Sequence, residues 1–114
     1  MLNNLSADMV ESAQFVTTIC SYNQGMEFEW DESKRISNLR KHGIDFSDVP
    51  VVFGGSIVTV EDDRFDYGEE RFVTFGLLQG HVIAVVHTEN EDSIRIISAR
   101  KATKYEQKTY FEQI

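Results

Sequence analysis

The sequence predicts an α+β fold in which two N-terminal helices precede a run of strands and a C-terminal helix follows it. Four segments are rich in β-branched and aromatic residues and are separated by turn residues, as strands are: residues 57–61, 71–78 and 82–87, and the stretch that begins at Ser93. Two segments before them carry helix-capping signals, and the tail Ala102–Gln113 has the pattern of a helix. Runs of strands bounded by helices are typical of the α+β class.

The first predicted helix follows a short strand at Phe28–Trp30. Asp31 is a suitable N-cap, because its carboxylate accepts the unpaired N–H groups of the first turn. Ile36 and Leu39 mark one face of the helix. Gly43 stands where a left-handed C-cap residue is expected, so the helix is predicted to end there.

The second predicted helix begins after Asp45, with Asp48 three residues later in a relation like that of a capping box. Pro50 removes a backbone hydrogen bond, so this helix is predicted to be short or distorted. Gly54 and Gly55 end it. Its buried side is predicted to contain Phe46, Val49, Val52 and Phe53.

The centre of the sheet is predicted from a hairpin. The tight turn Gln79–Gly80 makes residues 71–78 and 82–87 pair antiparallel. Val82–Val86 is apolar throughout, which is typical of a central strand that is covered on both faces.

The length and the net charge of the chain limit the functions that it can have. A chain of 114 residues that is 41% hydrophobic can form one domain with a real core. The net charge of −8 and the pI of about 4.7 argue against binding of nucleic acid through overall charge, so such binding needs a local cationic patch. The acidity also suits a basic protein partner.

Cys20 is the only cysteine, so we expect neither a disulfide framework nor a cysteine metal cluster, which fits a reducing cytoplasm. No apolar run approaches the ~20 residues that a membrane-spanning helix needs, and the N-terminus lacks the features of a signal peptide. No convincing metal-ligand spacing or phosphate-binding loop appears, so no metal and no other cofactor are expected. The sequence therefore predicts a cytoplasmic protein without a membrane segment.

Residues 1–25 differ from the rest of the chain. They contain no Lys or Arg and their apolar residues are scattered, whereas Met26 opens a segment that reads like a natural start. We expect residues 1–25 to be an extension and residues 26–114 to form the single domain. The alternative is a genuine helix over Ser6–Thr17 with Ser6 as its N-cap.

The stretch Ser93–Thr103 combines strand-forming isoleucines with cations. Three cations, Arg95, Arg100 and Lys101, lie within three residues of Ser98 in the sequence. Because a guanidinium presents a planar fork that matches phosphate oxygens, this combination suits a phosphodiester. The alternative is a core strand with charged ends.

Several ordered motifs between Met26 and the C-terminus resemble the BrnT family. They are FEWD at residues 28–31 with Lys34, NLRKHGI at 38–44, EERF at 69–72, VHTE at 86–89 and RIISARKAT at 95–103. BrnT proteins are the toxin half of bacterial type II toxin–antitoxin pairs. The resemblance implies a RelE-like fold, with two N-terminal helices and a C-terminal helix packed on an antiparallel sheet. It also implies ribonuclease activity and a DNA-binding, BrnA-like antitoxin. The antitoxin is expected to neutralise the toxin and to bring the complex to its own operator DNA.

Cleavage of RNA without a metal ion needs an activated 2′-hydroxyl, stabilised charge on the phosphorane and a proton for the leaving oxygen. The candidate catalytic residues are His87, Arg100, Glu70 and Arg71, and the candidates for RNA binding are Arg95, Ser98 and Lys101. A histidine with its usual pKa near ~6.5 can transfer protons, and we expect His87 and Arg100 to converge at one end of the sheet. Strict alternation places Arg95 and Arg100 on opposite faces, so they share a site only if a bulge or the strand end re-aims one of them.

These assignments have structural alternatives. His87 can be an edge-of-core histidine bonded to a backbone carbonyl, and Glu70 with Arg71 can form a solvated pair or a cross-strand salt bridge to Arg95. The protein can also be a non-catalytic member of the same fold that binds the antitoxin and helps repression, or a small binding module unrelated to RNA. Growth arrest on expression without the antitoxin separates the ribonuclease from both.

Overall fold

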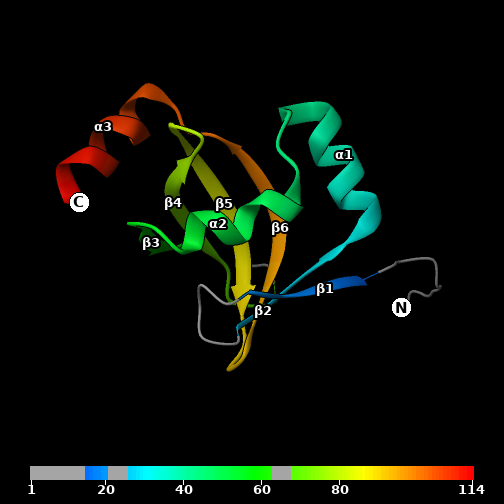
Figure 1. Ribbon diagram of the computed structural model, residues 1–114. Coiled ribbons are helices and arrows are strands. Elements are labelled where there is room, and N and C mark those ends of the chain that lie inside the picture. The colour runs from blue at the N-terminus through cyan, green and yellow to red at the C-terminus, as the bar shows by residue number, and fades with distance from the viewer. Residues whose placement is uncertain (1–14, 21–25, 63–67) are drawn as a thin grey trace.

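The computed structural model describes residues 15–20, 26–62 and 68–114, and its α+β fold confirms the predicted class (Figure 1). Six strands form one sheet in the order β1-β2-β6-β5-β4-β3. The strands are β1 Phe15–Cys20, β2 Met26–Asp31, β3 Val58–Glu61, β4 Phe72–Leu78, β5 His81–Glu89 and β6 Ser93–Lys101. The helices are α1 Glu32–His42, α2 Val49–Phe53 and α3 Lys104–Gln113, with a 3-10 turn at Phe46–Asp48 before α2.

Two details of the predicted arrangement are corrected. The helices α1 and α2 do not open the chain, because β1 and β2 precede them. The sheet is mixed rather than antiparallel, because β2 and β6 are parallel while the other neighbouring strands are antiparallel. The parallel pair arises because the chain leaves β2 through α1 and α2, forms the meander β3-β4-β5 and only then returns to the side of β2.

The predicted N-terminal extension lies mostly outside the described residues, which cover only Phe15–Cys20 of it. That segment is β1 and pairs antiparallel with β2. The alternative helix over Ser6–Thr17 is wrong at its C-terminal end, because residues 15–17 belong to this strand, and the rest of it lies outside the described residues.

The signals that predicted the first helix are confirmed, and those for the second are confirmed in part. The Asp31 carboxylate accepts the backbone N–H of Ser33 at 2.8 Å and caps α1, which ends at Gly43 with a φ of 74°. Asp45 caps the 3-10 turn rather than α2, and the expected capping-box relation is corrected, because Asp48 is itself the N-cap of α2 and makes no side-chain capping bond. Pro50 lies in the first turn of α2, where its missing N–H would have no helical partner anyway, and the helix is five residues long, as short as predicted.

The predicted hairpin is also confirmed. The strands β4 and β5 pair antiparallel around Gln79 and Gly80, which have φ values of 51° and 82°. Positive φ at both turn residues is the geometry that suits the twist of a two-residue hairpin. The residues Val82–Val85 are buried, and β5 lies between β4 and β6 as expected of a central strand.

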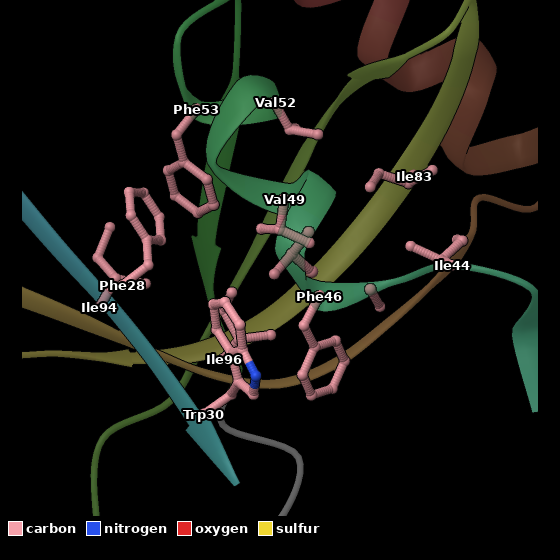
Figure 2. Close-up of a cluster of buried hydrophobic side chains, with 12 residues drawn as sticks. Phe28, Trp30, Ile44, Phe46, Val49, Val52, Phe53, Ile83, Ile94 and Ile96 are labelled. Atoms are coloured by element: carbon pink, nitrogen blue, oxygen red, sulfur yellow. The ribbon is translucent and has the colours of Figure 1, made fainter. Parts of the chain in front are cut away.

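The two faces of the sheet are covered to different extents. On the first, which we call the covered face, the segment from Ile44 through the 3-10 turn and α2 covers the main core (Figure 2). Its buried members are Phe28, Trp30, Ile44, Phe46, Val49, Val52, Phe53, Ile83, Val85, Ile94, Ile96 and Ala99. Burial of one large apolar side chain contributes about 1.5–3 kcal/mol, so this cluster is the main source of stability.

The helix α3 packs at one end of the opposite face, which we call the open face. Tyr110 of α3 packs there with Val82 and Ala102. Its hydroxyl donates a hydrogen bond of 2.7 Å to the carbonyl of Ser56. Val82 belongs to this face because its neighbour Ile83 points into the main core and side chains alternate along a strand.

A bulge interrupts the pairing of β5 with β6. Val86 pairs with Ser98, but the next residue of β5, His87, pairs with Ile96. Ile97 is therefore an extra residue on β6, and the register shifts at this point.

The bulge changes which residues of β6 share a face. Ile96 is buried on the covered face before the bulge, and Ala99, three residues later, is buried on the same face after it. Arg95 and Arg100 consequently both lie on the open face, although they are five residues apart. The bulge that the sequence left as a possibility is present.

Asn38 of α1 takes the place of a strand neighbour of β6. The strands β2 and β6 pair only as far as Trp30 opposite Ile96. Beyond that point the buried Asn38 side chain donates to the carbonyl of Ala99 at 2.9 Å and accepts its N–H at 3.1 Å. It also donates to the carbonyl of Ile44 at 3.0 Å. These bonds fix α1 against the edge that β2 leaves.

Candidate functional site on the open face

His87 lies in the core, on the covered face of the sheet. Its side chain is 0% exposed and lies between the rings of Phe53 and Phe72, whose centroids are 5.3 and 5.9 Å from its own. Its Nε2 atom shares a hydrogen bond of 2.7 Å with Oγ1 of Thr74. His87 is therefore a core histidine that a threonine hydroxyl orients.

Burial lowers the pKa of His87 from 6.5 to about 4. The nearest Glu89 oxygen is 3.6 Å from Nδ1, and that half-exposed carboxylate does not offset the desolvation of a charged imidazole. The approach to Glu89 is therefore not an ion pair at neutral pH. A neutral, enclosed imidazole cannot reach a substrate, so the geometry does not support the predicted proton-transfer role.

Arg100 lies on the open face, but its guanidinium is bound to α3. Its two terminal nitrogens donate to the two carboxylate oxygens of Glu106 at 2.8 and 3.0 Å. These bonds lower the pKa of Glu106 from 4.5 to about 2. Glu106 also accepts the backbone N–H of Thr103 at 2.9 Å in the capping box that begins α3. Arg100 thus anchors the start of α3.

The expected convergence of His87 and Arg100 is wrong. Arg100 pairs with Ala84 of β5, which is three residues from His87, so alternation places the two side chains on opposite faces. Their contacts agree, since His87 packs on Phe53 of α2 and Arg100 binds Glu106 of α3.

A row of polar side chains crosses the open face. Arg95 on β6 pairs with Thr88 on β5 and, on its other side, with Glu29 on β2. The β4–β5 register, continued by one residue before β4, places Arg71 opposite Thr88. Since neighbouring strands are about 4.8 Å apart, the backbones of the two arginines are about 10 Å apart with the Thr88 side chain between them.

A pocket of about 220 Å³ opens beside this row, where β2 and α1 part from β6. It is lined by Asp31, Lys34, Glu69, Arg71, Arg95, Ile96 and Ile97. Three cations and two carboxylates therefore surround one opening. Such a cluster of planar and point charges suits a phosphate group.

The two carboxylates of the pocket differ in their surroundings. Asp31 accepts the backbone N–H of Ser33 at 2.8 Å and its hydroxyl at 2.6 Å, so it is occupied in capping α1. Glu69 is more exposed and accepts a bond of 3.3 Å from Nε of Arg71. Glu69 is therefore the carboxylate that a ligand in the pocket can reach.

The remaining predicted site residues lie outside this pocket. Glu70 is exposed, and Arg71 forms an ion pair with its other acidic neighbour, Glu69. Ser98 lies on the open face opposite Val86. Lys101 lines a separate pocket of about 140 Å³ at the far end of β6. Of the seven predicted residues, only Arg71 and Arg95 meet in the larger pocket.

Sequence reasoning missed Lys34, Glu69 and Thr88. Thr88 had a signal, because it follows His87 in a strand and must face the opposite way. Lys34 and Glu69 are remote in sequence from β6. They reach the pocket beside β6 only because α1, which carries Lys34, and the segment before β4, which carries Glu69, pack next to it.

One comparison with known proteins bears on this site. A family model described as a ribonuclease toxin, BrnT, of type II toxin–antitoxin systems matches residues 30–106. The matched segment is more than half of the chain and contains every residue that lines the larger pocket. No curated protein matches the chain. No helix of the described residues has both the length and the apolar character needed to cross a membrane.

Proposed function

The chain belongs to the BrnT family of ribonuclease toxins from type II toxin–antitoxin systems, and on that premise we propose that it cleaves RNA in the pocket between Arg71 and Arg95. The observation that carries the proposal is the row Arg95–Thr88–Arg71 on the open face, beside a pocket that lies within the family match. Two guanidinium groups on either side of a hydroxyl can bind neighbouring oxygens of one phosphodiester.

In the proposed reaction the two arginines hold the non-bridging oxygens of the scissile phosphate. The 2′-oxygen of the ribose attacks phosphorus, and the bond between phosphorus and the 5′-oxygen breaks. The products are a 2′,3′-cyclic phosphate and a free 5′-hydroxyl. The phosphorane carries additional negative charge on the oxygens that Arg71 and Arg95 hold, so these donors stabilise the transition state more than the substrate.

The proton transfers are assigned to the two other reachable ionisable side chains of the pocket. Glu69 takes the proton of the 2′-hydroxyl, and Lys34 gives a proton to the departing 5′-oxygen. Asp31 is less suited because it caps α1, and His87 is enclosed on the other face. Side chains thus fill all three tasks, and we propose that cleavage does not require a metal ion.

The finer family properties are proposed with it. The partner is a BrnA-like antitoxin that neutralises the toxin and binds operator DNA, so this chain reaches DNA only through the antitoxin. The fold is RelE-like, and residues 26–114 form the toxin domain. The net charge of −8 supports a basic partner, because opposite charge accelerates and stabilises association.

Expression with and without the antitoxin tests the proposal. The wild type is expected to arrest growth alone and not with the antitoxin encoded beside it. The purified chain is expected to cleave RNA in the presence of a chelator and to leave cyclic phosphate ends. Cleavage that stops in the chelator and returns with a divalent cation contradicts the metal-free mechanism.

A second candidate function is that of a non-catalytic partner of the antitoxin. It is favoured by the acidity of the chain and by the two carboxylates that share the pocket with the three cations. This reading expects full antitoxin binding and operator repression, but neither growth arrest nor RNA cleavage by the wild type.

A further inference from the structure

The outer edge of β3 and the groove beside it form a surface that the proposed cleavage does not use. In the described part of the chain, β3 is the last strand of the sheet on this side. A groove of about 180 Å³ lies between β3 and α3 on the open face. Its apolar walls are Val58, Val60 and Phe75 from the sheet and Tyr105, Thr109 and Tyr110 from α3.

The backbone direction of β3 follows from one hydrogen bond. Asp62, directly after β3, donates its N–H to the carbonyl of Arg71 at 2.8 Å, so its polar backbone groups face β4. In an antiparallel strand these groups alternate in direction, so those of Val60 also face β4. The N–H and C=O groups of Thr59 and Glu61 therefore point to the outer edge. Such an edge is a template for one more strand.

The side chains beside this edge are apolar and exposed. Val60 is 47% exposed and Tyr105 is 78% exposed, and both line the groove. A strand added to β3 places alternate side chains on the open face, directly next to Val60 and beneath α3. Backbone groups at the edge select an extended segment, and the groove selects apolar side chains at every second position.

Charge decides between the possible occupants. A second copy of this chain also carries a net charge of −8 and is repelled. Glu61 adds a carboxylate at the edge itself. We propose that the edge of β3 and the groove bind an extended segment of the antitoxin with alternating apolar residues and flanking Lys or Arg. This proposal depends on the proposed function in one respect, namely that the protein has an antitoxin as its partner.

The outer edge of β3 lies near the pocket, so a segment bound there can also obstruct the pocket. Asp62 is bonded to Arg71, so the C-terminal end of β3 leads to the row of arginines. With strands about 4.8 Å apart, a segment that continues past Glu61 runs about 10 Å from Arg71. The bound antitoxin thus passes close enough to the pocket to block RNA.

Two exposed aromatic residues of α3 provide a matched test. Tyr105 lines the groove, whereas Phe111, 53% exposed, lines the pocket near Lys101 instead. The antitoxin from the adjacent reading frame is titrated into purified toxin variants by calorimetry. Tyr105→Ala is expected to weaken binding at least tenfold, and Phe111→Ala by less than twofold. Glu61→Pro removes an outward N–H that the sheet does not use. It is expected to weaken binding as strongly as Tyr105→Ala does and to leave the thermal unfolding temperature unchanged.

The outcomes separate docking from catalysis. Wild-type affinity in both Tyr105→Ala and Glu61→Pro overturns the proposal. Sedimentation of the toxin alone as a dimer that Tyr105→Ala dissociates also overturns it, because the edge then joins two copies. RNA cleavage by the free variants is measured in parallel and is expected to equal that of the wild type. If the wild type cleaves no RNA but loses antitoxin binding on Tyr105→Ala, the docking stands and the cleavage proposal fails.

Discussion

His87 and Thr88 are adjacent on β5, but they lie in opposite environments. His87 points to the covered face, where two aromatic rings enclose it and lower its pKa to about 4. Thr88 points to the open face, between Arg95 of β6 and Arg71, the residue directly before β4. One step along the strand separates a neutral core residue from the middle of a cationic row.

The difference shows that position within the strand decides the role more than residue type does. Histidine is the residue most often used for proton transfer near neutral pH, yet here it stabilises the core. The two arginines of β6 also differ in role, although both lie on the open face. Arg100 anchors α3 through Glu106, and Arg95 borders the pocket. Substitutions on the two faces should therefore act independently, one set on RNA cleavage and the other on stability.

The largest effect is expected from the arginines of the open face. Arg95→Ala and Arg71→Ala each should lower the rate of RNA cleavage by about 10²–10³, as loss of a charge-stabilising donor typically does. Neither should change the free energy of unfolding by more than about 0.5 kcal/mol, the scale of surface substitutions. Single-turnover cleavage and denaturant unfolding measure the two quantities. Arg40→Ala on exposed α1 is the control, and equal losses in all three variants would show that only general charge matters.

On the covered face, His87→Ala should have the opposite profile. It leaves a cavity between Phe53 and Phe72 and removes one of the two side-chain hydrogen bonds of Thr74, so the free energy of unfolding should fall by about 3 kcal/mol. At a temperature where the variant stays folded, the cleavage rate should remain within about twofold of the wild type. A well-folded variant that loses cleavage would return His87 to the active site.

The depressed pKa of His87 predicts how stability depends on pH. Between pH 6.5 and about 4 the unfolded state binds a proton that the folded state does not, so lowering the pH favours unfolding. The stabilisation is complete above about pH 6.5 and is lost as the pH falls to about 4, for a total of about 3 kcal/mol. Denaturant unfolding across this range should show the slope in the wild type, and His87→Gln should abolish it.

A smaller effect is expected at Gly76, where β4 passes under α2. A Cβ atom at this position would lie 2.5 Å from Cγ1 of Val52, so Gly76→Ala forces the core apart. Overpacking of this kind costs about 1–3 kcal/mol. Pairing it with Val52→Ala, which removes the clash, should recover part of the loss in a double-mutant cycle. Strict additivity of the two changes would contradict the contact.

The smallest effect is expected at the ion pair of Arg100 with Glu106. About a third of the Arg100 side chain is exposed, so Arg100→Ala should cost only about 1 kcal/mol of stability after solvent screening. Glu106→Gln should cost a similar amount, and the double variant should cost less than the sum of the two. RNA cleavage should stay unchanged in all three. A loss of cleavage in Arg100→Ala alone would extend the site along β6.

Local signals predicted the elements well, because each depends on a few neighbouring residues. Asp31 and Gly43 bound α1 as predicted, and Gln79–Gly80 forms the hairpin turn. The site depended on properties that no local pattern carries. The extra residue Ile97 changes the phase of β6, and the contact of Arg100 with Glu106 requires the position of α3.

The parallel pairing of β2 was missed for the same reason, because only the crossover through α1 and α2 returns β6 to its side. The sequence predicts Arg71 and Arg95 as site residues from their charge and from their place at strands expected to be neighbours. Their meeting in one pocket is a product of strand order and register.

The side chain of Asn38 pairs with the backbone N–H and C=O of Ala99 at the point where β2 and β6 separate. A carboxamide has the same donor and acceptor as a peptide unit, and here one side chain stands in for a whole segment of main chain at Ala99. Because no further strand is needed there, β2 is free to turn away into α1. The pocket opens beside Ile96 and Ile97, where β2 departs, and extends to Glu69 and Arg71. The proposed RNA site thus lies where the side chain of Asn38, rather than a further strand, pairs with β6.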